Sequence, residues 1–344
     1  MNDEQIKAKI EKTLTGNRLK DRRFLILEWQ ALSISSSLLS NGVLQYVENQ
    51  IDEVLPLNIN RFTKDMELNP DLWVAYLLHR AGQYTNGYPL EKAFKLCRLA
   101  VNELESHNPR INDQKMQYFA VDDPYEETLI KSVLNAPGPF QIIDLPFAEA
   151  YYLLAEILFA MGDEIQAVNF LGLANNWNPV SVPILMRISE FFKEKKIVDK
   201  LMMVGKFATS IVTDLDMLGV IIRFVGYAYY LDGKYPQAYA CYHESLRYGK
   251  AGKGVSAEID AILAAMDKTE VYTPKKKEIK DLFLGDKFFP GPSSMAFDAL
   301  KNTIRRLFDE TEYSLVIDYA DEFLKTKSDA MVLKLRRLAL EHLA

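Results

Sequence analysis

The chain has 344 residues, of which 49% are hydrophobic and 26% are charged, values that suit a folded protein with several packed units or an elongated array. A formal net charge of −6 argues against general binding to nucleic acid or to an anionic membrane, because both would repel the chain. Two cysteines, Cys97 and Cys241, are too few for a disulfide framework or a cysteine-rich metal site, and this small number fits a reducing compartment.

The N-terminal sequence shows neither an export signal nor a membrane span. Residues 1–14 are charged and polar throughout and lack the apolar core of a signal peptide. The longest apolar stretch, residues 24–44, is interrupted by Glu28, Gln30 and five serines, so it is not expected to cross a membrane. These features predict a cytoplasmic protein.

Helical patterns open the chain. Apolar residues recur at three- and four-residue spacing, and long alternating patterns typical of strands are absent. Residues 1–60 are predicted to form an N-terminal helical region without a clear repeat. Residues 61–107 are predicted to form a divergent helix pair, marked by Trp73 on its first helix and by Ala93 and Ala100 on its second.

An irregular insertion is predicted over residues 108–147, which contain five prolines. Within it, a short helix is expected over residues 124–134, with Asp123 as its N-cap and acidic residues in its first turn. Long irregular segments of this kind are uncommon in compact proteins and are often functional.

The best-defined unit follows over residues 148–181. An aromatic, a leucine, a small residue and a second apolar residue come in order on its first helix: Tyr151, Leu154, Ala155 and Leu158. Gly162 falls at the turn, where a positive φ is useful, and Ala167 on the second helix faces Ala155, so that the two helices can approach closely. Pro179 ends the unit because proline cannot continue a helix.

The same order recurs twice more before residue 252. The clearer recurrence begins near Gly219 and contains Val225, Gly226, Tyr229, Gly233, Tyr235, Ala238 and Tyr242, with Lys250 where the terminal proline would stand. Residues 182–213 fit the frame more loosely, although Ala155 and Ser189 are 34 residues apart. Residues 148–252 are therefore predicted to form three repeats.

The chain then continues with a helix over residues 256–266 and a linker, which together make up the segment 253–292. Residues 293–344 are predicted to form a further helix pair and a closing helix over residues 330–343. A closing helix with a polar outer face is expected at the end of a repeat array, which would otherwise expose its core.

These motifs and their 34-residue period resemble the tetratricopeptide repeat (TPR) family, most closely over residues 148–252. The resemblance implies an all-α fold in which antiparallel helix pairs stack into a right-handed superhelix, a TPR-like α-solenoid. In that family the first helix of each pair lines a concave groove that binds proteins or peptides. The residues that the frame places in this groove are Tyr152, Glu156, Phe159, Met186, Glu190, Lys193, Arg223, Tyr227 and Tyr230.

This predicted groove combines aromatic anchors with a few charges, and tyrosine and arginine are frequent at binding hot spots. Some of these aromatic residues are expected to pack within or between repeats instead. Some relatives clamp a partner's terminal carboxylates on this face, but Glu156 and Glu190 would repel such a group here.

The sequence predicts no catalytic residue, no metal site and no cofactor. Its four histidines do not pair at metal-ligand spacing, and the glycine- and lysine-containing run at residues 249–254 lacks the features of a phosphate-binding loop. The remaining enzymatic hypothesis would bring Asp122, Asp123 and His107 into one cleft.

The predicted function is therefore a protein- or peptide-binding scaffold without nucleic-acid or membrane partners. The alternative is a peptide-responsive regulatory protein that acts through a protein partner. An enzyme on a helical scaffold is the third hypothesis.

Overall fold

The regular structure of the chain is almost entirely α-helical, which confirms the all-α prediction. The computed structural model describes residues 3–16, 18–34, 41–54, 70–84, 90–107, 116–121, 123–133, 139–248, 255–268, 270–286 and 288–343. Within these ranges the only strands are two segments of four residues. No helix in the same ranges combines the length and the apolar character that a bilayer crossing requires.

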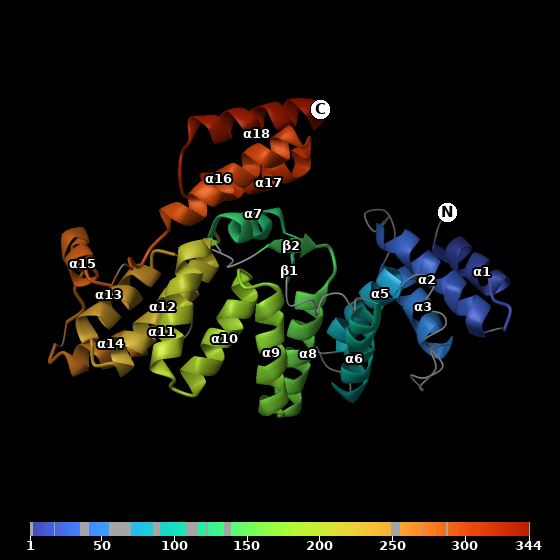
Figure 1. Cartoon of the computed structure of the whole chain (residues 1–344), viewed down its shortest axis with the longest axis horizontal. Coiled ribbons are helices and arrows are strands. Elements are labelled where there is room, and N and C mark those ends of the chain that lie inside the picture. The colour runs from blue at the N-terminus through green and yellow to red at the C-terminus, as the bar shows by residue number, and fades with distance from the viewer. Residues whose placement is uncertain are drawn as a thin grey trace. The chain divides into compact units, whose positions relative to one another are not determined.

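The helices fall into two units, Met1–Ala120 with Asp144–Ala174 and Val121–Ile143 with Asn175–Ala344. The first unit contains α1 (Asp3–Thr13), α2 (Arg18–Ile34), α3 (Asn41–Val54), α5 (Pro70–Tyr84), α6 (Leu90–His107), β1 (Gln117–Ala120), α8 (Phe147–Met161) and most of α9 (Glu164–Trp177), as Figure 1 shows. The second contains α7 (Pro124–Val133), β2 (Phe140–Ile143), α10 (Val182–Glu194), α11 (Val198–Ile211), α12 (Leu215–Leu231), α13 (Tyr235–Ser245), α14 (Val255–Ala265), α15 (Lys276–Leu282), α16 (Ser294–Asp309), α17 (Tyr313–Leu324) and α18 (Ala330–Leu343).

The predicted repeat motif forms a helix pair, α8 and α9, in the first unit. Ala155 and Ala167 are both completely buried, as small residues between two close helices should be. Gly162 follows α8 with φ of 83°, a left-handed conformation that favours glycine, and its N–H bonds to carbonyls of the last helical turn. The role predicted for Gly162 is therefore confirmed. In the same helix pair, the ring of Tyr151 stacks on that of Phe170 with centroids 6.1 Å apart.

A buried charged network joins α2, α3 and α5 of the first unit. Glu48 on α3 is only 1% exposed, and its carboxylate accepts a hydrogen bond from Arg80 on α5 at 3.1 Å. The Nε2 atom of His79 lies 2.8 Å from the same carboxylate, and the indole N–H of Trp29 on α2 donates to it at 3.4 Å. A buried carboxylate needs such partners, because an unpaired one would be strongly destabilising.

We expect this network to make stability depend on pH. Burial alone would raise the pKa of Glu48, but the bond from His79 and the charge of Arg80 outweigh it and hold the pKa below its ordinary value of 4.5. The unfolded chain then binds the proton more readily. The stability that the ionised Glu48 carboxylate contributes is therefore complete above pH 4.5. It is lost as the pH falls through the pKa that Glu48 has in the folded chain.

Urea unfolding of the wild type and of Glu48→Gln, from neutral pH down to about pH 3, tests this dependence. The stability difference between the two proteins should shrink as the solution is acidified. A difference that stays constant over this range would contradict the assignment.

In the second unit, helices α10 to α14 pack in chain order, and each contacts the next (Figure 1). Glycines set the closest approach of α12 to α13 and to the turn that follows α13. A Cβ atom on Gly226 would lie 2.9 Å from Cδ2 of Tyr242, and one on Gly219 would lie 2.2 Å from the carbonyl oxygen of Tyr248. The small residue predicted at position 226 is thus required by packing.

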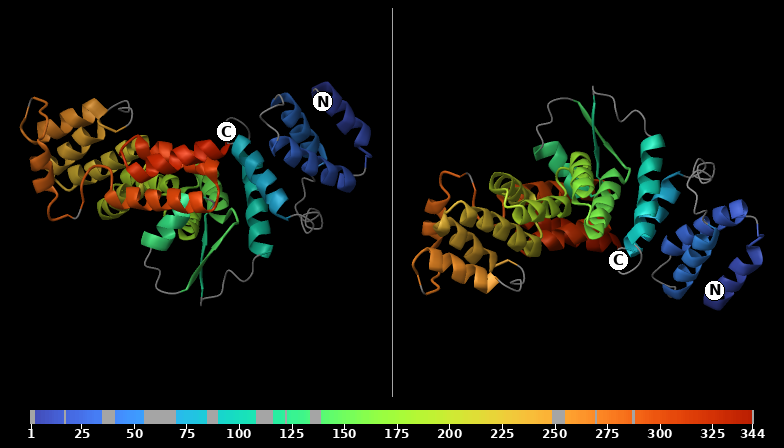
Figure 2. Two further views of the ribbon diagram at one scale, coloured as in Figure 1. Left: turned by 90° about the horizontal axis from the view of Figure 1, so that it is seen from above. Right: turned by 90° about the horizontal axis from the view of Figure 1, so that it is seen from below.

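The three C-terminal helices form a group of their own in the second unit, and their red ribbons stay together in both views of Figure 2. Helix α7 packs against α16 of this group. Arg306 on α16 pairs with Glu127 at 2.9 Å and donates to the carbonyl of Pro124 at 2.9 Å. Asp123 caps α7 by accepting bonds from the N–H groups of Tyr125 and Glu126, which confirms the predicted cap and short helix.

Residues 270–286 and 288–292, in the segment predicted to be a linker, contain helix α15 and pack closely on α12 and α13. Tyr272 stacks on Tyr239 with ring centroids 4.7 Å apart. The hydroxyl of Tyr229 donates to Asp286 at 2.5 Å, and the ring of Phe283 lies 5.7 Å from that of Tyr229. We call this segment the strap. Of the three phenylalanines that the sequence places in this segment, Phe283 and Phe288 are buried, whereas Phe289 is 42% exposed.

Candidate functional site

The nine predicted groove residues lie on three helices in two units. Tyr152, Glu156 and Phe159 are on α8 of the first unit, where each is half-buried. The other six are half-buried residues of the second unit, with Met186, Glu190 and Lys193 on α10 and Arg223, Tyr227 and Tyr230 on α12.

Side chains of α10 and α12 meet around Tyr227. The Nζ atom of Lys193 lies 5.1 Å from the centre of the Tyr227 ring and 5.9 Å from that of Phe224. Met186 and Tyr227 both pack against the buried cluster of Leu201, Phe224 and Ala228. Tyr227 therefore packs against the core and is also partly exposed at the surface. Glu190 instead pairs with Arg187 on its own helix at 3.3 Å.

A small cavity opens beside these residues. Its volume is about 80 Å³, and it is lined by Tyr227, Tyr230, Tyr242, Glu258, Ala261 and Ile262. We call it the tyrosine cavity. Helices α12, α13 and α14 each contribute to its wall. The rings of Tyr227 and Tyr230 stack with centroids 6.5 Å apart, so two of the predicted groove residues form one aromatic surface.

Glu258 brings negative charge to the cavity wall. This residue was not among the predicted groove residues. Its carboxylate lies 3.6 Å from Nζ of Lys193, and both side chains are more than a third exposed. Burial raises the pKa of the Tyr242 phenol, and the charge of Glu258 raises it further. Tyr242 thus stays neutral and can act as a hydrogen-bond donor.

Arg223 completes the charged groups near the cavity. Loss of hydration lowers the pKa of its guanidinium, while the charge of Glu258 acts in the opposite direction. Its Nη1 atom is buried and finds no hydrogen-bond acceptor among the residues that the structure describes. A buried donor in this state lacks the hydrogen bond that most such groups make.

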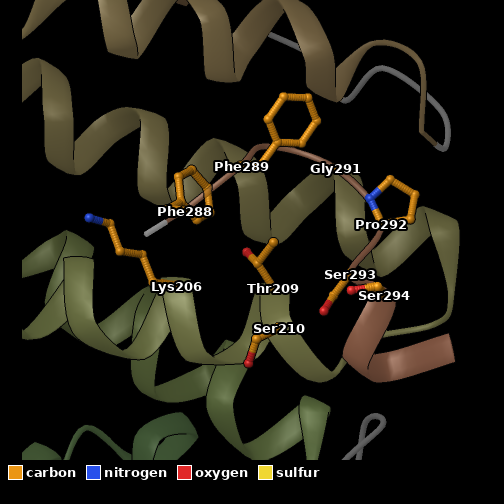
Figure 3. A pocket seen from close by; sticks show the side chains of 9 residues that line it. All are labelled: Lys206, Thr209, Ser210, Phe288, Phe289, Gly291, Pro292, Ser293 and Ser294. Carbon is orange, nitrogen blue, oxygen red and sulfur yellow. The ribbon is translucent and has the colours of Figure 1, made fainter. Parts of the chain in front are cut away.

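A larger cavity of about 380 Å³ lies between α11 and residues 288–294, and Figure 3 shows its lining. The polar side chains that α11 contributes to this lining already have partners. Lys206 pairs with Asp286 at 3.7 Å and lies over the rings of Tyr229 and Phe288. Thr209 and Ser210 donate their hydroxyl protons to carbonyls of their own helix. In Figure 3 the Lys206 ammonium points away from Ser293 and Ser294.

These observations favour the tyrosine cavity as the candidate site, although it is the smaller of the two. Two predicted groove residues, Tyr227 and Tyr230, form its aromatic wall, and Glu258 brings a charge to its lining. The nearby Arg223 has a buried Nη1 atom without an acceptor among the described residues. In the larger cavity, Thr209 and Ser210 form hydrogen bonds within α11, and Lys206 pairs with Asp286 of the strap.

The residues of the enzymatic hypothesis are only partly described. Asp122 and the side chain of His107 lie outside the described residues, as does Lys250 at the end of the third predicted repeat. Asp123 is occupied as the cap of α7. Both cysteines are free and buried, and burial raises the pKa of Cys97 to about 12, so that it is not a reactive thiolate at neutral pH.

Comparison with protein-family models and with curated proteins finds no match for this sequence. The class that the structure itself defines is an all-α protein whose neighbouring helices pack against one another. The function is therefore argued below from the geometry of the tyrosine cavity.

Proposed function

We propose that this chain is a cytoplasmic scaffold that binds a protein or peptide on the surface around the tyrosine cavity. The proposal includes a TPR-like α-solenoid in which α10–α11 and α12–α13 are successive repeats. Helices α10 and α12 of the second unit would then line the concave groove. The chain would act by binding and not by catalysis.

Three packing features support the repeat architecture. Helices α10 and α12, the first helices of two successive pairs, contact each other as well as their own partners. Close approach within the α12–α13 pair depends on Gly226, as the repeat frame predicts. Between pairs, a Cβ atom on Gly205 of α11 would lie 2.8 Å from Val225 of α12, so a second small residue lets successive pairs pack tightly.

The tyrosine cavity is the observation that carries the proposed function. Half-buried tyrosines beside a small apolar recess are typical of surfaces that anchor a partner's side chain. Tyrosine offers a large rigid contact area and a hydroxyl that can orient the ligand. A volume of about 80 Å³ suits one inserted side chain and not a cofactor.

Truncation of Tyr230 is expected to weaken binding of a partner by about 2 kcal/mol, roughly thirtyfold in Kd, because the partner would lose one aromatic wall of its pocket. Tyr230 suits this test better than Tyr227, which also packs on the core. Partners would be captured from the native cell on wild-type protein, identified, and titrated against wild type and Tyr230→Ala.

Tyr313→Ala provides the matched control, since Tyr313 is a half-buried tyrosine on α17 that stacks on His342 and does not line the cavity. All three proteins should show the same thermal transition by circular dichroism. Equal affinity of wild type and Tyr230→Ala for every identified partner would refute a binding function for this surface.

A further inference from the structure

The charges beside the tyrosine cavity do not cancel. Two cationic side chains, Lys193 and Arg223, act on a single carboxylate, that of Glu258. The 3.6 Å separation of Lys193 and Glu258 exceeds ordinary hydrogen-bond distance, and the exposure of both groups makes their pairing weak. The site therefore keeps a positive charge that an external anion can complement.

Arg223 gains most from such an anion. The residue is half-buried, so part of its guanidinium remains accessible, while its buried Nη1 atom finds no acceptor within the described part of the chain. Loss of hydration lowers the pKa of the guanidinium, and the negative charge of Glu258 only partly offsets this effect. Arginine binds carboxylates through charge-assisted bonds that are stronger than neutral ones.

The end of α10 extends this positive region. Residues 193–200 hold four lysines against Glu194 and Asp199, a net charge of +2, although the whole chain carries −6. The lysines at positions 195, 196 and 200 are exposed. A local field of this sign attracts acidic partners and accelerates their encounter.

We propose that the tyrosine cavity recognises an acidic peptide segment, in which one apolar side chain enters the cavity and a neighbouring Asp or Glu carboxylate binds Arg223 and Lys193. This inference rests on the proposed binding function and adds the chemistry of the partner. Glu258 then acts as an internal competitor, because its carboxylate partly compensates the charge of the same two cations.

Three pools of fluorescent peptides test the proposal. Each peptide carries a central Leu or Phe that is flanked by Asp and Glu, by Lys and Arg, or by Ser and Asn. All are acetylated and amidated, so that only side-chain carboxylates are present. Binding to the full chain is measured by fluorescence anisotropy at low and at raised salt.

The acidic pool should bind at least tenfold more tightly than the basic pool, and raised salt should reduce that preference. Arg223→Gln should weaken acidic binding about tenfold or more, and Lys193→Gln should weaken it by less, because the Lys193 side chain is more than a third exposed. Glu258→Gln should strengthen acidic binding several-fold, because it removes the competing carboxylate. Lys325→Gln is the charge-matched control, because Lys325 is an exposed lysine that pairs with Glu322. This variant should bind all three peptide pools as the wild type does.

The outcomes separate this inference from the function on which it rests. Preferential binding of the basic pool, or weaker acidic binding by Glu258→Gln, would overturn the acidic assignment. Binding that Tyr230→Ala abolishes but that the charge variants leave unchanged would overturn the assignment alone and retain the binding function. Absence of binding by every pool would count against both.

Discussion

Replacement of Glu48 by methionine is expected to destabilise the chain by about 3–5 kcal/mol, because it leaves a buried guanidinium without its ion-pair partner. Arg80 is only 4% exposed and lies 3.1 Å from the Glu48 carboxylate. The same substitution removes the acceptor for Trp29 and for His79. Urea unfolding followed by circular dichroism at neutral pH measures the loss.

A double-mutant cycle distinguishes loss of the pair from loss of packing. Glu48→Met with Arg80→Met should cost less than Glu48→Met alone, because neither charge is then left buried. We expect a coupling energy of about 2 kcal/mol between the two positions. Strictly additive effects would show that the ion pair contributes nothing beyond the volume of its side chains.

Replacement of Gly219 by alanine is expected to destabilise the second unit by about 2–3 kcal/mol. The added methyl group would lie 2.2 Å from the carbonyl oxygen of Tyr248 and 3.3 Å from that of Ser245. Both contacts are with backbone, so a side-chain rotation cannot relieve them, and α12 must move away from the end of α13. This cost exceeds the gain of up to about 1 kcal/mol from removing a glycine inside a helix.

Gly172→Ala is the matched control. Gly172 also lies inside a helix, α9, but a Cβ atom there would have nothing within 4 Å. This variant should be more stable than wild type by about 0.5–1 kcal/mol. The two substitutions thus have opposite expected signs in urea unfolding, and a stabilised Gly219→Ala would refute the close approach of α12 to the end of α13.

The sequence was informative wherever a residue acts within its own helix pair. The small residues Ala155, Ala167 and Gly226, the turn at Gly162 and the cap at Asp123 all belong to local motifs with fixed spacing. Such positions are set by the geometry of one or two helices. The spacing of residues along the chain therefore reveals them.

Other features depend on contacts between distant segments, which no local spacing encodes. The Glu48–Arg80 pair resembles ordinary surface charge in the sequence, yet it is buried where α3 meets α5. Glu258 lies in a predicted helix, but only the packing of α14 on α13 brings it to the tyrosines. Tyr242 was interpreted as part of the second helix of a repeat, and its hydroxyl interacts with Glu258. The strap was predicted to be a linker, because its proline- and lysine-rich sequence does not reveal helix α15 or the stacking of Tyr272 on Tyr239.

The origin of the cavity wall in three helices has a thermodynamic consequence. Tyr227 and Tyr230 come from α12, Tyr242 from α13, and Glu258, Ala261 and Ile262 from α14. A ligand that touches the whole wall binds only those molecules in which α14 is docked. By mass action, a ligand present at one hundred times its Kd would then stabilise the docked arrangement by about 2.7 kcal/mol. Ligand occupancy and the attachment of α14 would rise and fall together, so that slower amide hydrogen exchange in α14 reports binding.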